Sequence, residues 1–317
     1  MPPKNKSNEL TLIRTYDAPL KAVWDAWTDL KQVAQWWGPR GFTITTHSKD
    51  LRVGGHWRYT MHGPDGVDYP NIARYLEVEP QRRLVYDHGA TDDQPALFRV
   101  TVLFSETSRG TKMEMTMALP TPEAAEETRK FVKRAGGEST WDRLSEFLTQ
   151  HLVGQKRFVI NRSFPASREQ LFQMWTQPEH LSHWLATTGA KMSFLRGNIR
   201  EGGDAFVSMT FAGGVKLYCR FQYREILKPE RIVYTQQFCD ENEAPGRHPM
   251  SPTWPQGMRT VVTFNEEGPE QTRVTVESEA DASSAPNELE TFVQGRAGMT
   301  HGWNGSFDKL EALLKTP

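Results

Sequence analysis

The chain has 317 residues, of which 24% are charged and 37% hydrophobic, and its 38 basic and 39 acidic residues leave a formal net charge of -1. These values are typical of a globular protein and exclude the concentrated positive charge of a nucleic-acid-binding surface. No apolar run approaches the ~20 residues that cross a bilayer, so we also expect no membrane insertion.

The chain opens with a polar segment, residues 1–8, that lacks the apolar core of a secretory signal. We expect a disordered lead-in and, by default, a cytoplasmic protein. The two cysteines, Cys219 and Cys239, have no partners at metal-motif spacing and are too few for a disulfide framework. Phosphate-binding loops and nucleophile motifs are also absent from the sequence, which therefore predicts no metal and no cofactor.

The sequence repeats itself after 148 positions, from Arg14-Thr15-Tyr16 to Arg162-Ser163-Phe164. The same shift, without a gap, aligns further pairs: Trp27 with Trp175, Trp36 with Trp184, Arg52 with Arg200, Gly54-Gly55 with Gly202-Gly203, Glu77 with Glu225 and Tyr86 with Tyr234. The period is far longer than that of a solenoid, and each copy is long enough to bury its own core. We therefore predict two complete domains, 9–152 and 153–317.

Each copy shows the same order of periodicities. A short strand, about 9–15, precedes a helix that begins near Pro19 and a second short helix over about 30–37. In the second copy Ser167 is the predicted N-cap of the first helix, with Gln170 as in a capping box, and Pro178 begins the second helix. A period of two then predicts further strands, which in the first copy lie near 43–50, 56–61, 71–76, 84–88, 97–104 and 112–119.

Both copies end in a helical pattern. In the second copy an apolar stripe runs from Leu289 to Leu314, which predicts one helix of roughly 39 Å at about 1.5 Å per residue. The first copy carries Phe131 and Trp141 on a similar stripe, but Gly136-Gly137 interrupts it and predicts a kink or a break. We expect a short linker near 151–155 between the two copies.

The order of elements resembles the helix-grip, or START-like, fold of the SRPBCC superfamily. The two copies contain the motifs Ala18-Pro19, Trp36-Trp37, Arg52-Val53-Gly54-Gly55, Tyr75-Leu76-Glu77, Trp254-Pro255, Gly298-Met299 and Gly302-Trp303. These motifs are similar to those of the family named after the C-terminal domain of the activator of heat shock protein 90 ATPase. The resemblance implies an α+β protein with two tandem helix-grip domains. In each, a curved antiparallel sheet wraps a long C-terminal helix and two short helices.

Folds of this type bind ligands between the sheet and the long helix, so inward-facing side chains are the candidate ligand-binding residues. Alternation along the strands selects most of them, since neighbouring residues point to opposite faces. In the first copy they are Trp36, Trp57, Tyr59, Met61, Tyr86, Met113, Met115 and Trp141. In the second copy they are Trp184, Val207, Met209, Phe211, Phe221, Tyr234, Met299 and Trp303, with Tyr223 also expected to face inward.

Simpler explanations compete with these sites. An inward stripe of Trp, Tyr and Met also fits a filled core, and we expect Trp27 and Trp175 to be core residues, whereas Trp36 and Trp184 lie near the usual cavity mouth. His180 and His183 fit surface histidines better than a metal site, because no third ligand is near. Arg52 with Glu77, and Arg200 with Glu225, are expected to form surface ion pairs; alternatively an arginine binds an anionic ligand group.

Three functions remain open. The first is non-catalytic binding of a small hydrophobic or aromatic molecule, as a carrier, sensor or sequestering protein, with the second copy expected to hold the working site. The second, implied only by the family name, is a co-chaperone module that regulates a chaperone ATPase in the stress response. The third is a hydrolase or cyclase with Tyr59, His88 or Tyr86 as acid or base; no catalytic residue is assigned, and the oligomeric state is open.

Overall fold

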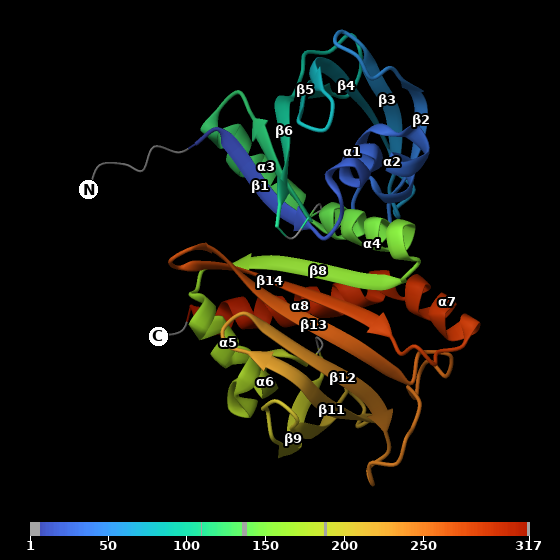
Figure 1. The fold of residues 1–317 in the computed structure, drawn as a ribbon, viewed down its shortest axis with the longest axis vertical. Coiled ribbons are helices and arrows are strands. Elements are labelled where there is room, and N and C mark those ends of the chain that lie inside the picture. Colours follow the sequence, from blue (N-terminus) through green and yellow to red (C-terminus); the bar gives the residue numbers. More distant parts are fainter. Residues whose placement is uncertain (1–6, 109, 135–137, 187–188, 316–317) are drawn as a thin grey trace. The chain divides into compact units, whose positions relative to one another are not determined.

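The computed structural model describes residues 7–108, 110–134, 138–186 and 189–315, and the chain divides into two compact units, Met1–Gly154 and Gln155–Pro317 (Figure 1). Most of the predicted lead-in lies outside the described residues. At its end Asn8 is tied to Leu119, whose backbone N–H donates to Asn8 at 2.9 Å and whose carbonyl accepts from the Asn8 side chain at 2.8 Å. The division between the units falls two residues beyond the predicted one, because a helix continues to Val153 and ends at Gly154, where φ is 72°.

The two units repeat one order of elements. In the first unit these are β1 (Glu9–Tyr16), α1 (Leu20–Thr28), α2 (Leu30–Trp36), β2 (Thr43–Lys49), β3 (His56–His62), β4 (Asp68–Glu79), β5 (Arg83–Gly89), β6 (Phe98–Thr107), β7 (Gly110–Ala118), α3 (Pro122–Arg134) and α4 (Ser139–Val153). In the second unit they are β8 (Arg157–Phe164), α5 (Arg168–Thr176), α6 (Pro178–Trp184), β9 (Lys191–Gly197), β10 (Asp204–Thr210), β11 (Lys216–Leu227), β12 (Arg231–Cys239), β13 (Gly257–Gly268), β14 (Gln271–Ala280), α7 (Pro286–Gln294) and α8 (Arg296–Leu314). The two short helices and the run of strands confirm the sequence prediction.

Each unit forms one antiparallel sheet, with seven strands among the described residues. The strand order is β1-β7-β6-β5-β4-β3-β2 in the first unit and β8-β14-β13-β12-β11-β10-β9 in the second. The first strand therefore pairs with the last, and the remaining strands follow as a meander. Within the second unit, Figure 1 shows α5, α6 and α8 against one face of the curved sheet. The α+β helix-grip architecture predicted from the sequence is confirmed.

Local sequence features explain the corresponding turns. The Ser167 hydroxyl accepts a hydrogen bond from the Gln170 backbone N–H at 3.3 Å, which confirms the predicted N-cap. At the turn before β3, a Cβ on Gly55 would lie 2.2 Å from the Asp50 carbonyl oxygen. At the matching Gly203 it would lie 2.1 Å from the Asn198 carbonyl oxygen. Only glycine fits these two turns, which is why the Gly-Gly pair occurs in both copies.

The predicted single C-terminal helix is wrong in one respect, because α7 and α8 are separate helices that meet at Gly295. Trp254, which lies between β12 and β13, packs against the backbone at this junction. A Cβ on Gly295 would lie 2.4 Å from that ring. In the first unit Phe131 of α3 is 58% exposed, so the prediction that it belongs to a buried stripe is wrong. Gly136-Gly137, where a kink or a break was predicted, lie outside the described residues. No helix in the described ranges has both the length and the apolar character to cross a membrane.

Candidate functional site

The inward faces predicted from alternation are the core faces of the two sheets. In the first unit Trp57 and Tyr59 of β3 are buried and Met61 packs beside them. The other predicted residues of this unit belong to the same core: Trp36, Tyr86, Met113, Met115 and Trp141. Alternation thus identified the side chains that face the interior, which leaves the question of whether they enclose any free space.

Aromatic rings fill the interior of the first unit beside its two short helices. The Trp37 indole lies 5.5 Å from the Trp57 ring and 6.2 Å from the Trp141 ring, centroid to centroid, and its N–H donates to the Tyr59 hydroxyl at 3.1 Å. Tyr59 is stacked on Trp57 at 4.1 Å. Trp141 of α4 is stacked on Trp27 of α1 at 5.8 Å. The predicted ligand-binding residues of this unit therefore pack largely on one another, as in a filled core.

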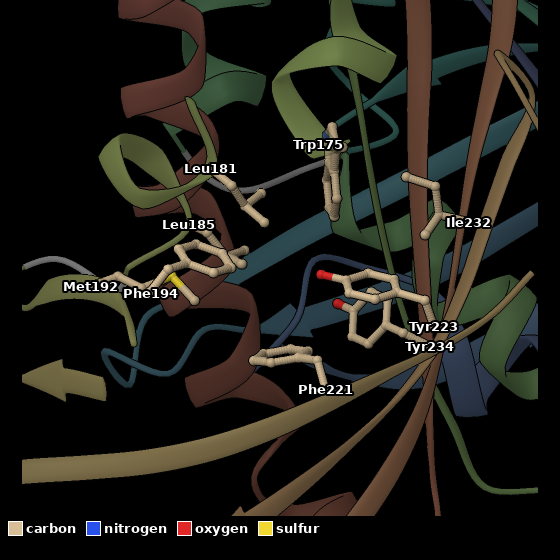
Figure 2. A pocket seen from close by; sticks show the side chains of 9 residues that line it. All are labelled: Trp175, Leu181, Leu185, Met192, Phe194, Phe221, Tyr223, Ile232 and Tyr234. Atoms are coloured by element: carbon tan, nitrogen blue, oxygen red, sulfur yellow. The ribbon is translucent and has the colours of Figure 1, made fainter. Parts of the chain in front are cut away.

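The second unit has a pocket at the corresponding place (Figure 2). Its empty volume, counted with the space that is open to solvent, is about 320 Å³. Nine side chains from α5, α6, β9, β11, β12 and the residue after α6 line it: Trp175, Leu181, Leu185, Met192, Phe194, Phe221, Tyr223, Ile232 and Tyr234. Among the described residues, the lining is apolar and aromatic and carries no carboxylate and no imidazole.

The ungapped 148-residue register shows how the two interiors differ. Three large aromatic residues of the first unit have smaller counterparts in the second: Trp37 corresponds to Leu185, Trp57 to Ala205 and Tyr59 to Val207. The change runs the other way at two positions, where Thr46 corresponds to Phe194 and Ala73 to Phe221. In the second unit the position after the second short helix therefore carries no indole. Phe194 and Phe221 line the space there instead.

Two tyrosines supply hydroxyl groups to the lining, beside the Trp175 indole N–H, which is buried without a hydrogen-bond partner among the described residues. Tyr223 and Tyr234 are direct cross-strand partners on β11 and β12, with ring centroids 6.0 Å apart. Figure 2 shows both hydroxyl oxygens pointing away from the sheet and toward Leu185 and Phe194. Burial raises the pKa of each phenol above its ordinary value. Both hydroxyls are therefore protonated at neutral pH and able to donate hydrogen bonds.

Stacked indoles form the wall behind the pocket. Trp303 of α8 lies on Trp175 of α5, with centroids 5.9 Å apart and planes 18° apart. Trp175, expected only as a core residue, is thus both a core residue and part of the lining. Beside the same stack in the first unit, Trp141 on Trp27, the counterpart of Leu185 is the Trp37 indole.

Trp36 and Trp184 do not lie at a cavity mouth. Both are 0% exposed. The Trp36 indole N–H donates to the Ala26 carbonyl at 2.9 Å, and the Trp184 indole N–H donates to the Met174 carbonyl at the same distance. Each indole therefore joins the two short helices of its unit, which is a structural role.

Of the residues predicted for the second unit, the structure places Phe221 and Tyr234 in the lining, together with Tyr223. Val207 is buried in the same core, and Met209, Phe211, Met299 and Trp303 pack against that core without lining the pocket. The sequence analysis did not select Leu181, Leu185, Met192, Phe194 and Ile232. Leu181 and Leu185 are spaced by one helical turn, and Met192 and Phe194 alternate on β9, so the same periodicity arguments applied to α6 and β9 would have found four of them.

The shared polar positions form exposed pairs near the sheet surface, although not the expected ones. Arg52 pairs with Asp50 at 2.8 Å, and Glu77 pairs with Arg83 at 3.0 Å. In the second unit the Arg200 side chain donates to Asn198 at 3.1 Å, and Glu225 lies 3.7 Å from Arg231. These side chains point to solvent, and they offer no anion site at the pocket. No cluster of three or more metal-ligating side chains occurs among the described residues.

The three acid-base candidates of the first unit are buried or partly buried. Burial raises the pKa values of Tyr59 and Tyr86 and lowers the pKa of His88 to about 4. At neutral pH the two phenols are therefore protonated and the imidazole is neutral. His88 is stacked on Phe98 at 4.7 Å, an arrangement typical of a packed histidine.

Comparison with known proteins then identifies the relatives of both units. A model of the family described as Activator of Hsp90 ATPase homolog 1-like protein, AHSA1, matches residues 17–149 and again residues 165–315. The chain belongs to the AHSA1 family. Its two units are tandem AHSA1 domains, as the resemblance of the sequence implied. No curated protein matches the chain.

Solved structures similar to this AHSA1 chain each match about half of it. A protein from Nitrosomonas europaea is 25% identical, with 47% of this chain and 97% of that chain covered and a TM-score of 0.43. A protein from Mycobacterium smegmatis is 20% identical, with 53% and 95% covered and a TM-score of 0.44. A protein from Staphylococcus epidermidis is 26% identical, with 48% and 96% covered and a TM-score of 0.42.

Proposed function

We propose that the second AHSA1 domain binds one small hydrophobic or aromatic molecule, without chemical change, in the pocket between α6, β9 and the sheet. The observation that carries this proposal is the exchange of Trp37 for Leu185. Where the first domain packs an indole of its own, the second leaves a space lined by aromatic and aliphatic side chains. A carrier, a sensor or a sequestering protein needs such a space but no catalytic group.

The lining supports binding more than catalysis. Small-molecule sites are lined mostly by hydrophobic and aromatic side chains with few polar groups, and the nine residues of this lining have that composition. The only titratable side chains in the lining are Tyr223 and Tyr234, whose pKa values are raised by burial. Protonated phenols donate hydrogen bonds at neutral pH but do not act as general bases there, so the lining lacks the base that hydrolysis or cyclisation requires.

Indole is a suitable first probe, because it is the group that Trp37 places in the first domain. In an NMR titration of the full chain, indole should bind, and Leu185→Trp should weaken that binding by at least about ten-fold, because the new side chain takes the same space. Leu195→Trp is the matched control, since Leu195 lies on β9 but is exposed. Unchanged binding in Leu185→Trp, or equal losses in both variants, would contradict the proposal.

The family description names an activator of a chaperone ATPase, and that role extends to this chain only as a proposal by family. The stress-response role is likewise a proposal by family, and the cytoplasmic location is a proposal that rests on the polar N-terminal segment. An assay of a cognate chaperone ATPase with and without the full chain tests the co-chaperone role directly. A rate that responds to the wild type and equally to Leu185→Trp would show that this role does not depend on the pocket.

A further inference from the structure

The Tyr223 hydroxyl stands out among the polar groups of the pocket. Tyr223 is only 5% exposed, and its ring lies between Tyr234 and the apolar side chains of α6 and β9. Across the part of the chain that the structure describes, its hydroxyl makes no hydrogen bond, and burial rather than a partner sets its pKa. A buried hydroxyl without a partner is costly, so a group that pairs with it gains affinity from that contact.

The neighbouring Tyr234 is in a different position. Thr260, its cross-strand partner on β13, offsets part of the rise that burial causes in the pKa of Tyr234, and the Thr260 hydroxyl contacts the Ser278 hydroxyl at 2.9 Å. Tyr234 therefore has a hydroxyl of the sheet beside it. Burial and the neighbouring Tyr234 both raise the pKa of Tyr223, and no hydroxyl among the described residues of the sheet offsets that rise.

The first domain places a third phenol near the equivalent pair. There Tyr75 and Tyr86 occupy the matching positions, and Tyr59 of β3 adds a third phenol. Burial, and in second place the proximity of Tyr59, raises the pKa values of both Tyr75 and Tyr86, so the hydroxyls lie close together. In the second domain the counterpart of Tyr59 is Val207, which brings neither the ring nor the hydroxyl. The first domain thus holds an internal phenol where the second has none.

We propose that the guest of the second-domain pocket is a phenol, an aromatic ring with one hydroxyl, whose oxygen pairs with the Tyr223 hydroxyl and whose ring lies among Leu185, Phe194 and Phe221. This inference rests on the proposed function, because it specifies the chemical class of the molecule that the pocket binds. The phenol takes the place of the Tyr59 side chain of the first domain. Its hydroxyl can donate to Tyr223 or accept from it, so the contact needs no ionised group.

Two probes of nearly equal shape separate the hydroxyl from the ring. The compound p-cresol is the side chain of tyrosine, and p-xylene has a methyl group in place of the hydroxyl. Both are titrated into the full chain by calorimetry or ligand-observed NMR, with wild type, Tyr223→Phe and Tyr218→Phe. Tyr218 is the matched control, because it lies on the same strand but stacks on Phe206, outside the core. Thermal unfolding shows that each variant is folded.

Tyr223→Phe should weaken p-cresol binding roughly five-fold, the equivalent of one ordinary hydrogen bond, and change p-xylene binding by less than about two-fold. Tyr218→Phe should change neither. Equal effects of Tyr223→Phe on the two probes, or an equal loss of p-cresol binding in Tyr218→Phe, would overturn the phenol inference while leaving the pocket as a binding site. If wild type binds neither these probes nor indole, the proposed function fails together with the inference.

Discussion

Trp303 of α8 is stacked on Trp175 of α5, with the ring centroids 5.9 Å apart and the planes 18° apart. The first domain repeats the relationship with Trp141 of α4 on Trp27 of α1, at 5.8 Å and 15°. In both domains an indole from the last helix therefore fixes that helix on the first one. In the second domain Trp175 also lines the pocket, so the stack that holds the last helix is also part of the candidate site.

Loss of this stack should destabilise the second domain. Trp303→Ala removes a partly buried indole and an aromatic pair, and we expect a decrease of about 2–3 kcal/mol in the free energy of unfolding. The measurement is urea-induced unfolding of the full chain, with hydrogen exchange used to follow α8. His301→Ala, an exposed change on the same helix, should have little effect. Equal stability of the two variants would show that the stack does not hold the helix.

The junction of α7 and α8 should depend on glycine at one position. Gly295→Ala places a Cβ 2.4 Å from the Trp254 ring, and the required shift should cost about 1–3 kcal/mol of unfolding free energy. Gly298→Ala is the matched control on the same helix, because nothing lies within 4 Å of a Cβ there. Since alanine favours a helix over glycine, Gly298→Ala should stabilise by up to about 1 kcal/mol. Thermal unfolding of the two variants measures both changes in stability. A change of the same sign in both variants would contradict this prediction.

The first domain should gain a pocket if its indole is removed. Trp37→Leu gives it the residue found at the matching position of the second domain and removes the hydrogen bond to Tyr59. We expect a loss of about 2–4 kcal/mol of unfolding free energy and a second binding site for indole. Titration of indole into this variant measures the number of sites. One site per chain, as in wild type, would mean that the first domain collapses around the smaller side chain.

His88 should make the stability of the first domain depend on pH. Burial lowers its pKa from the ordinary 6.5 to about 4, so between these values the unfolded chain binds a proton that the folded chain does not. The free energy of unfolding should therefore fall as the pH decreases from 6.5 toward 4, by about 1–2 kcal/mol for this partly buried ring. The His88→Phe variant keeps a ring against Phe98 and should show a flatter pH dependence in urea unfolding at pH 5 and pH 7. Substituting exposed His180 by Phe should leave the dependence as it is in wild type.

Much of the architecture was predictable because its determinants are local. The repeat aligns Trp27 with Trp175 and Gly55 with Gly203, and a helix face or a tight turn follows from a few neighbouring residues. Alternation on β3 correctly placed Trp57 and Tyr59 in the core. These features need only the period of the pattern and the steric limits of the backbone.

The remaining features depend on residues that are distant in the sequence. At the junction of α7 and α8 the Trp254 ring approaches Gly295, and no helical periodicity indicates a contact between residues so distant in the sequence. Whether a core is filled or open depends on the fit of side chains from several elements. The effect of Leu185 at the position that corresponds to Trp37 can be judged only when the rings around that position are known. For this reason the sequence selected the inward faces but missed more than half of the pocket lining.

The most direct test of this account is native mass spectrometry of the full chain with indole, because the account assigns one binding site per chain. We expect one indole per chain in wild type and in Leu195→Trp, and none in Leu185→Trp. Two indoles per wild-type chain, no indole at all, or an adduct that persists in Leu185→Trp would contradict a single pocket in the second domain.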